Sequence, residues 1–285
     1  MRGLSRLLAA AGAAAAVVAF APGLAAASPV TPGLAGLTIV SPIASGYAAV
    51  PKPGGSPDFT HVQSAYQVPA VNCTMTPNGI AQTRAGLDGI GDDTVERVGI
   101  SEACKNGAAS YTAWYQMFPA MGSPALTFHP SPGDNVMASV TVAGGAYTLS
   151  IQDLTSGMSF TVNKSCSSCL NSSAQVTAGS PPGKAPADFT SVHFTGIVVT
   201  DGAGVSGGLA NPAWLTDKLT QLGSPHTVAG ALPAPYSAFT DTWAPWPVRA
   251  LPVRVPRCPR SSNGPATRRC AAGPPRYAGC PAGSF

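Results

Sequence analysis

The chain has 285 residues, of which 45% are apolar and only 10% are charged. Long amphipathic helices need repeated Glu, Lys, Arg and Leu, and these are scarce, whereas β-branched runs between Gly, Pro, Asn and Asp turns are common. The composition therefore predicts an all-β protein and excludes a helical bundle.

The formal charge of +4 is unevenly distributed along the chain. Between Ser28 and Trp243 there are seven basic and twelve acidic side chains, which gives this part a formal charge of −5. Seven arginines follow Trp243. Nucleic-acid-binding domains carry basic patches that neutralise phosphates. We therefore expect no nucleic-acid partner for this part of the chain.

Residues 1–27 have the three-part pattern of a secretory signal peptide. Arg2 and Arg6 give a basic leader, residues 7–20 form an uncharged apolar run, and Ala25 and Ala27 supply small residues for cleavage. The alternative is an uncleaved anchor, but a membrane span needs roughly 20 apolar residues. We predict cleavage, export to an extracellular or cell-envelope location, and no membrane span in the mature protein.

After a Pro- and Gly-spaced lead-in over residues 28–44, the chain indicates many short strands separated by turns. The predicted strands are Phe59–Val68, Gln82–Leu87, Val95–Ile100, Tyr111–Phe118, Asn135–Val142, Tyr147–Asp153, Ser159–Asn163, Val192–Thr200 and Ala238–Trp243. The Ala143-Gly144-Gly145 turn predicts a hairpin between the fifth and sixth of these. Residues 212–222 are the best helix candidate, with Asn211 as N-cap. Short strands with regular turns favour a two-sheet sandwich or a barrel.

The domain is predicted to span residues 45–243, because the composition changes after Trp243. Residues 244–285 contain nine Pro and seven Arg and no acidic residue. Such a segment cannot bury enough apolar surface to fold alone. Two interpretations remain open. One is a disordered basic tail that touches an anionic surface, and the other is out-of-frame sequence from a GC-rich gene.

Four of the seven cysteines lie in the predicted domain, which fits an oxidising compartment. The simplest pairing is Cys73 with Cys104 and Cys166 with Cys169. The C-S-S-C sequence could instead be a redox or zinc pair. A zinc site would need two more ligands, and none is evident, while a redox motif would want a strand-to-helix context. We therefore favour two structural disulfides and predict no metal site.

Eight short motifs follow one another in a recognisable order. The most specific is Y-T-A-W-Y-Q-M-F-P at 111–119. The others are S-G-Y-A at 45–48, V-Q-S-A-Y-Q-V-P at 62–69, A-G-L-D-G at 85–89, E-R-V-G-I at 96–100, P-G-D at 132–134, L-T-S-G at 154–157 and F-T-S-V-H-F-T at 189–195. Together they resemble the eqolisins, glutamic peptidases of the aspergilloglutamic and scytalidoglutamic type, over roughly residues 45–243. The resemblance implies a two-sheet antiparallel β-sandwich of concanavalin or jelly-roll type.

The resemblance also implies a catalytic pair, a Glu that acts as general base and then general acid and a Gln that positions water and stabilises the oxyanion. In this chain Arg97 stands at the Gln position and Gln175 at the Glu position. An amide has no titratable proton, so Gln175 cannot replace the Glu, whereas Arg97 still offers donors to an oxyanion. Asp88 matches an assisting carboxylate, and Gln116 stands where the aromatic block of the family has Glu.

We therefore expect a secreted, monomeric, non-catalytic domain that binds peptide or glycan in the retained cleft without a cofactor. The expected binding residues are Tyr47, Trp114, Tyr115 and Gln116, although aromatic side chains on such strands can equally belong to the core. Two alternatives remain open. One is an active acid endopeptidase with a displaced carboxylate such as Asp88, and the other is a passive cell-envelope protein.

Overall fold

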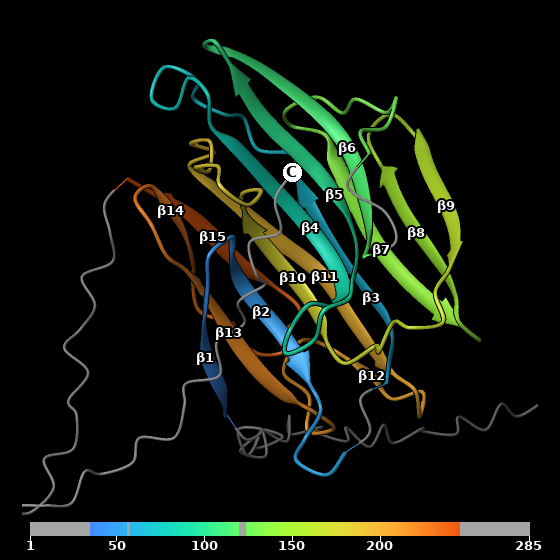
Figure 1. Ribbon diagram of the computed structural model, residues 1–285. Coiled ribbons are helices and arrows are strands. Elements are labelled where there is room, and N and C mark those ends of the chain that lie inside the picture. Colours follow the sequence, from blue (N-terminus) through green and yellow to red (C-terminus); the bar gives the residue numbers. More distant parts are fainter. Residues whose placement is uncertain (1–34, 56–57, 120–123, 246–285) are drawn as a thin grey trace, which may run out of the picture. The chain divides into compact units, whose positions relative to one another are not determined.

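A computed structural model describes residues 35–55, 58–119 and 124–245, which form two packed β-sheets (Figure 1). The seven-stranded sheet has the spatial order β1 (Ala35–Ser41), β13 (Leu215–Gln221), β2 (Ala44–Val50), β10 (Ala174–Gly179), β4 (Ile80–Asp88), β5 (Val95–Lys105) and β6 (Ala108–Phe118). The second sheet has the order β14 (His226–Ala229), β15 (Phe239–Ala244), β11 (Ser191–Asp201), β3 (Phe59–Gln67), β7 (Asn135–Ala143), β8 (Ala146–Asp153) and β9 (Ser159–Ser165), and β12 (Ser206–Gly207) pairs with β11. All pairs are antiparallel except β1 with β13.

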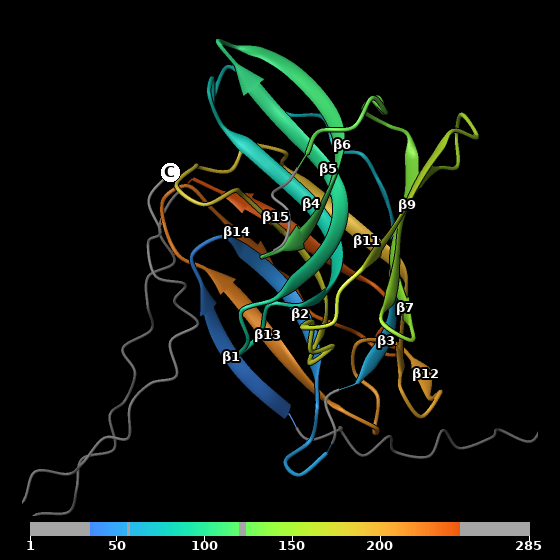
Figure 2. The same cartoon turned by 45° about the vertical axis from the view of Figure 1, so that its right-hand side comes forward.

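The hydrophobic core lies between the two sheets, which Figure 2 shows as separate layers. In β7 the buried residues alternate with exposed or half-buried ones, and Val136, Ala138, Val140 and Val142 point inward. This period of two is the mark of a strand with one face on the core. By contrast, every residue of β10 and all but the first of β4 are buried. The outward-facing side chains of these two strands are therefore buried as well.

The all-β sandwich predicted from composition is confirmed, and each of the nine predicted strands lies within or largely overlaps a strand of the structure. The predicted hairpin is also present, because Ala143 pairs with Ala146. Gly144 and Gly145 between them have φ angles of 56° and 79°. Two consecutive residues with positive φ are the signature of a type I′ turn, whose twist matches that of the strands.

The predicted helix at 212–222 is wrong, because residues 215–221 form β13 between β1 and β2. Asn211 caps a turn and not a helix, since its backbone oxygen accepts the Trp214 amide and its Oδ1 accepts the Ala213 amide. Within β13 the buried residues Asp217, Leu219 and Gln221 alternate with half-buried ones, which is strand periodicity. No helix is present among the residues that the structure describes.

Both predicted disulfides, Cys73–Cys104 and Cys166–Cys169, are present. They are consistent with an extracellular protein. The predicted signal peptide lies outside the described residues, as does the tail beyond residue 245. Over the described part of the chain, no helix has the length and apolar character needed to cross a membrane. The segment expected to be a lead-in contributes β1, the edge strand of the seven-stranded sheet, which the sequence did not predict.

Candidate functional site

Arg97 and Gln175, which stand at the expected catalytic positions, lie in one cross-strand row of the seven-stranded sheet. Gln175 pairs with Gly86 of β4, and Gly86 pairs with Arg97 of β5. The row continues to Gln116 of β6 beyond Arg97. Residues directly opposite each other in antiparallel strands project from the same face. The fold therefore brings three of the predicted site residues together on one face.

That face points away from the core. The neighbouring row consists of Tyr47, Val176, Ala85, Val98 and Tyr115, and all five belong to the hydrophobic core. Because side chains alternate between the faces of a strand, the row with Arg97 and Gln175 is on the outer face of the sheet. Both side chains are nevertheless buried, with exposed fractions of 9% and 6%.

Gly86 leaves the space between Gln175 and Arg97 free of a side chain. A Cβ atom at Gly86 would meet the Arg97 Cβ at 2.6 Å and the Glu96 carbonyl oxygen at 2.8 Å. Real Cβ contacts are not that close, so this position requires glycine unless the sheet shifts. Gln175 and Arg97 are two strand spacings apart, about 10 Å between backbones. They face each other over the backbone of β4.

The Arg97 guanidinium lies between two side chains of β6. Its Nε donates a hydrogen bond of 2.6 Å to Gln116 Oε1, and its Cζ lies 5.5 Å from the centroid of the Trp114 ring. Trp114 is on the same outer face, and its buried Nε1 has no hydrogen-bond partner within the described residues. A buried indole N–H normally finds an acceptor. The Trp114 indole N–H is thus a buried donor beside the Arg97 guanidinium, without an acceptor in the described part of the chain.

A second guanidinium, that of Arg84, lies on the same face, and the sequence reasoning did not include it. Arg84 is almost fully buried and donates to Thr177 Oγ1, Gln82 Oε1 and the Ile43 carbonyl. Burial first, and then the positive charge of Arg97, lower the pKa of Arg84 well below its ordinary value. Its position in the predicted strand, two residues before Gly86, could have placed it on the face of the site.

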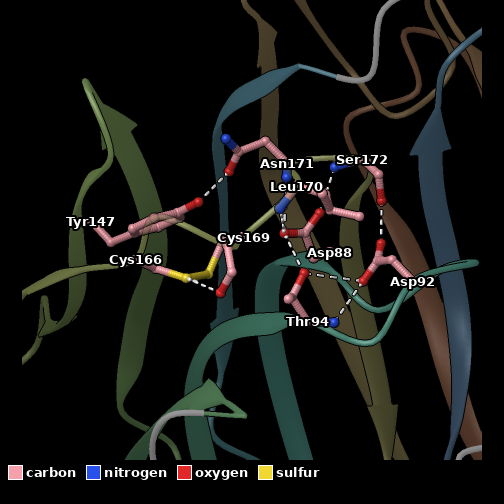
Figure 3. The surroundings of a disulfide bond; sticks show 10 residues. Asp88, Asp92, Thr94, Tyr147, Cys166, Cys169, Leu170, Asn171 and Ser172 are labelled. Atoms are coloured by element: carbon pink, nitrogen blue, oxygen red, sulfur yellow. Dashed lines mark hydrogen bonds between the residues drawn. A yellow bond between two sulfur atoms is a disulfide. The ribbon is translucent and has the colours of Figure 1, made fainter.

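Gln175 is tied to Asp88, because its Nε2 donates to the Asp88 main-chain oxygen. The Asp88 carboxylate is buried below the loop that precedes β10 (Figure 3). It accepts the backbone amides of Leu170, Asn171 and Ser172 and the hydroxyl of Thr94. Four protein donors thus surround this carboxylate, and it holds the loop in place.

Tyr47 and Tyr115 do not join the other predicted binding residues. Tyr47 packs edge-on against Phe239 at 5.1 Å between ring centroids and donates to the Gly230 carbonyl. Tyr115 stacks on Phe160 of the second sheet at 6.2 Å. Both therefore belong to the core, whereas Trp114 and Gln116 lie on the outer face with Arg97.

One carboxyl group does share the row of Gln175. Asp217 of β13 pairs with Ala48, and Ala48 pairs with Gln175. Asp217 Oδ1 accepts the Leu37 amide at 2.6 Å, where the pairing of β1 with β13 is irregular. Burial raises the pKa of Asp217, and the hydrogen bond from Leu37 partly offsets this. The sequence did not identify Asp217, because it fell in the predicted helix.

Residues 44–231 match the model of the Peptidase A4 family. The chain belongs to this family, the eqolisins. Scytalido-glutamic peptidase with a transition state analog inhibitor is similar over 71% of this chain and 98% of that chain, at 17% identity and a TM-score of 0.56. SCP-B, an eqolisin in complex with the tripeptide Ala-Ile-His, is similar over the same shares at 17% identity and a TM-score of 0.50. At this identity the structures show a common fold. No curated protein sequence matches the chain.

Proposed function

We propose that this eqolisin is a secreted, non-catalytic protein that binds peptides on the outer face of the seven-stranded sheet. The observation that carries the proposal is Gln175. The family resemblance assigns its position to the general base, and an amide cannot accept the proton of an attacking water. Replacement of the partner Gln by Arg97 removes the second half of the expected pair.

A peptide is the favoured ligand because scytalido-glutamic peptidase is similar in a complex with a transition state analog inhibitor, and SCP-B in a complex with a tripeptide. The Arg97 guanidinium and the Trp114 indole N–H lie side by side on this outer face. The positive charge of Arg97 favours a ligand that carries a carboxylate. We therefore expect acidic peptides to bind more tightly than neutral ones of the same length.

The displaced-carboxylate peptidase is the second candidate, and Asp217 supports it better than Asp88 does. Asp88 is surrounded by four donors and buried. Asp217 lies in the row of Gln175, separated from it only by the small side chain of Ala48. However, its Oδ1 accepts the Leu37 amide where the pairing of β1 with β13 is irregular. This structural role accounts for the burial of Asp217.

The test compares the full chain with an Arg97→Gln, Gln175→Glu double variant, using a denatured protein substrate between about pH 2 and 7, where carboxyl groups ionise. We expect no cleavage by the wild type and cleavage by the double variant at acid pH. Calorimetry should show the wild type binding Ala-Ile-Asp more tightly than Ala-Ile-Ala, without hydrolysis. Cleavage by the wild type that Asp217→Asn abolishes would establish the second candidate instead.

A further inference from the structure

A buried acid lies directly behind the Cys166–Cys169 disulfide. A carboxyl oxygen of Glu96 and the two Sγ atoms all lie within 4.8 Å of one another. Glu96 is on the core face of β5, opposite to Arg97, as strand alternation predicts. The cysteines lie just after β9, in the loop that leads to β10. Glu96 is fully buried, whereas both cysteines are partly exposed. A reductant from solvent can thus reach the sulfurs, and the acid is shielded behind them.

The Glu96 carboxyl group lies next to the Asp88 carboxylate as well as next to the disulfide. Within the described part of the chain no group donates a hydrogen bond to either of its oxygens, so burial disfavours the ionised form. Burial is the main cause that raises the pKa of Glu96 to about 9, followed by a hydrogen bond with the Asp88 carboxylate and by the negative charge of Asp88. Asp92 acts in the same direction, and Tyr147 of β8 is the further titratable neighbour. At neutral pH Glu96 therefore holds a proton beside the disulfide.

We propose that Cys166, Cys169 and Glu96 form a thiol–disulfide exchange site that takes dithiols, in which Glu96 gives its proton to the departing cysteine thiolate. The Ser168 hydroxyl lies 3.7 Å from Cys166 Sγ, so a thiolate at Cys166 would have a donor in place. Cys166 is therefore the leaving group, and Cys169 is the sulfur that is attacked. The separation of Glu96 from the sulfurs is one that a single water molecule can bridge.

The exchange takes place in two steps, with a dithiol as reductant. The first thiolate of the dithiol attacks Cys169 Sγ, a mixed disulfide forms, the Cys166–Cys169 bond breaks, and the Cys166 thiolate takes the proton of Glu96. The second thiolate of the dithiol then attacks the other sulfur of the same dithiol, which is bonded to Cys169 in the mixed disulfide. This releases the Cys169 thiolate, which is protonated from water. The protein disulfide gains two electrons and the dithiol becomes a disulfide. In the reverse direction, ionised Glu96 removes the proton from Cys166.

Exchange at this disulfide would change the outer face of the sheet, through the loop that holds Asp88. The three amides that hold the Asp88 carboxylate belong to Leu170, Asn171 and Ser172, which directly follow Cys169 (Figure 3). The Asp88 main-chain oxygen in turn holds Gln175. Opening the disulfide frees the loop at its N-terminal end, so the redox state of the cysteines acts on the placement of Gln175.

The experiment uses the full oxidised chain, in which free thiols are first blocked with iodoacetamide. Dithiothreitol is then added, and N-ethylmaleimide labelling followed by mass spectrometry gives the reduction rate of each disulfide. The buried Cys73–Cys104 disulfide is the internal control. The ratio of the two rates removes the ionisation of dithiothreitol itself. We expect Cys166–Cys169 to react faster, and the ratio to fall as pH rises through about 9, where Glu96 loses its proton.

Glu96→Gln keeps the shape of the side chain and removes the proton. We expect it to lower the rate ratio at pH 7 by about tenfold or more, because a positioned general acid typically contributes at least that much, and to flatten the pH dependence. Glu96→Asp should retain part of the pH dependence. A wild-type ratio that does not change between pH 6 and 10 would overturn the proposal, and this measurement needs no variant to fold. An unchanged rate and pH profile in a folded Glu96→Gln variant would overturn it as well.

Discussion

Gln175 and Arg97 lie on either side of Gly86 in one cross-strand row, and the close approach of Arg97 requires that Gly86 has no side chain. Gly86→Ala places a Cβ 2.6 Å from the Arg97 Cβ. We expect this substitution to lower the free energy of unfolding by about 1–3 kcal/mol, the usual cost of overpacking, and to weaken peptide binding. Urea denaturation and calorimetry measure the two effects.

Gly55→Ala is the matched control for that substitution. Gly55 lies in an exposed turn. The atom nearest to a Cβ added at Gly55 is the Lys52 carbonyl oxygen, at 3.1 Å. We expect a change in unfolding free energy within about 0.5 kcal/mol. Equal effects of the two substitutions would mean that the sheet relaxes around Gly86 and that glycine is not required at this position.

The strands that the sequence predicted are those with one polar face or a clear turn, such as β7 and β8 with their Gly144-Gly145 hairpin. β10 escaped prediction because both of its faces are buried and its small residues show no alternation. β13 was taken for a helix because Asn211 and Pro212 look like a helix start. Its strand character comes from pairing with β1 and β2, which are more than 160 residues away in sequence.

The site was predictable in part for the same reason. Motif order selected Arg97, Gln175 and Gln116, and the register of the structure places these three residues in one row. The aromatic residues could not be assigned to a face, because Trp114 and Tyr115 are neighbours and only the strand pairing says which of them points to the core. Asp217 joins this row through its long-range pairing with Ala48, which a motif does not contain.

Three buried carboxyl groups should make the protein more stable in mild acid than in base. Burial is the main cause that raises the pKa of Asp241 to about 7, of Glu102 to about 8 and of Glu96 to about 9. In the unfolded chain these groups ionise near pH 4. The folded state therefore binds more protons above that pH, and stability falls as pH rises towards the folded pKa values. Each group that stays protonated contributes a slope of about −1.4 kcal/mol per pH unit.

The cleanest window for this measurement is pH 6.5 to 8. Burial lowers the pKa of His226, which destabilises the fold as pH falls below its ordinary value of 6.5 and opposes the carboxyl groups there. Urea denaturation should show the unfolding free energy decreasing between pH 6.5 and 8, with a smaller slope in Glu102→Gln. The exposed Asp93→Asn substitution should leave the slope unchanged. A stability that rises over this window would contradict the assignment of protonated interior carboxyl groups.

The two disulfides should differ in what they contribute to stability. Cys73–Cys104 closes a loop with a sequence separation of 31, whereas Cys166–Cys169 has a separation of 3. The loop-closure relation gives about 3.7 kcal/mol for the first and about 1.9 kcal/mol for the second. We expect the Cys73→Ser, Cys104→Ser double variant to lose roughly twice as much unfolding free energy as the Cys166→Ser, Cys169→Ser variant. The reverse order would show that the C-S-S-C disulfide is chiefly a structural brace.

Substitution of Asp88 distinguishes a structural role from a catalytic role for this carboxylate, which belongs to the family motif A-G-L-D-G. The two Asp88 carboxylate oxygens accept three backbone amides and the Thr94 hydroxyl. Asp88→Asn leaves only one acceptor oxygen, and the new NH₂ group is a donor that faces some of these donors. We expect a loss of about 1–3 kcal/mol in unfolding free energy and faster hydrogen exchange of the amides of residues 170–172. Asp93→Asn, at an exposed neighbouring carboxylate, should change neither. If Asp88→Asn leaves stability and exchange intact and yet alters hydrolysis of a peptide, the carboxylate acts on substrate, and the binding-only function fails with it.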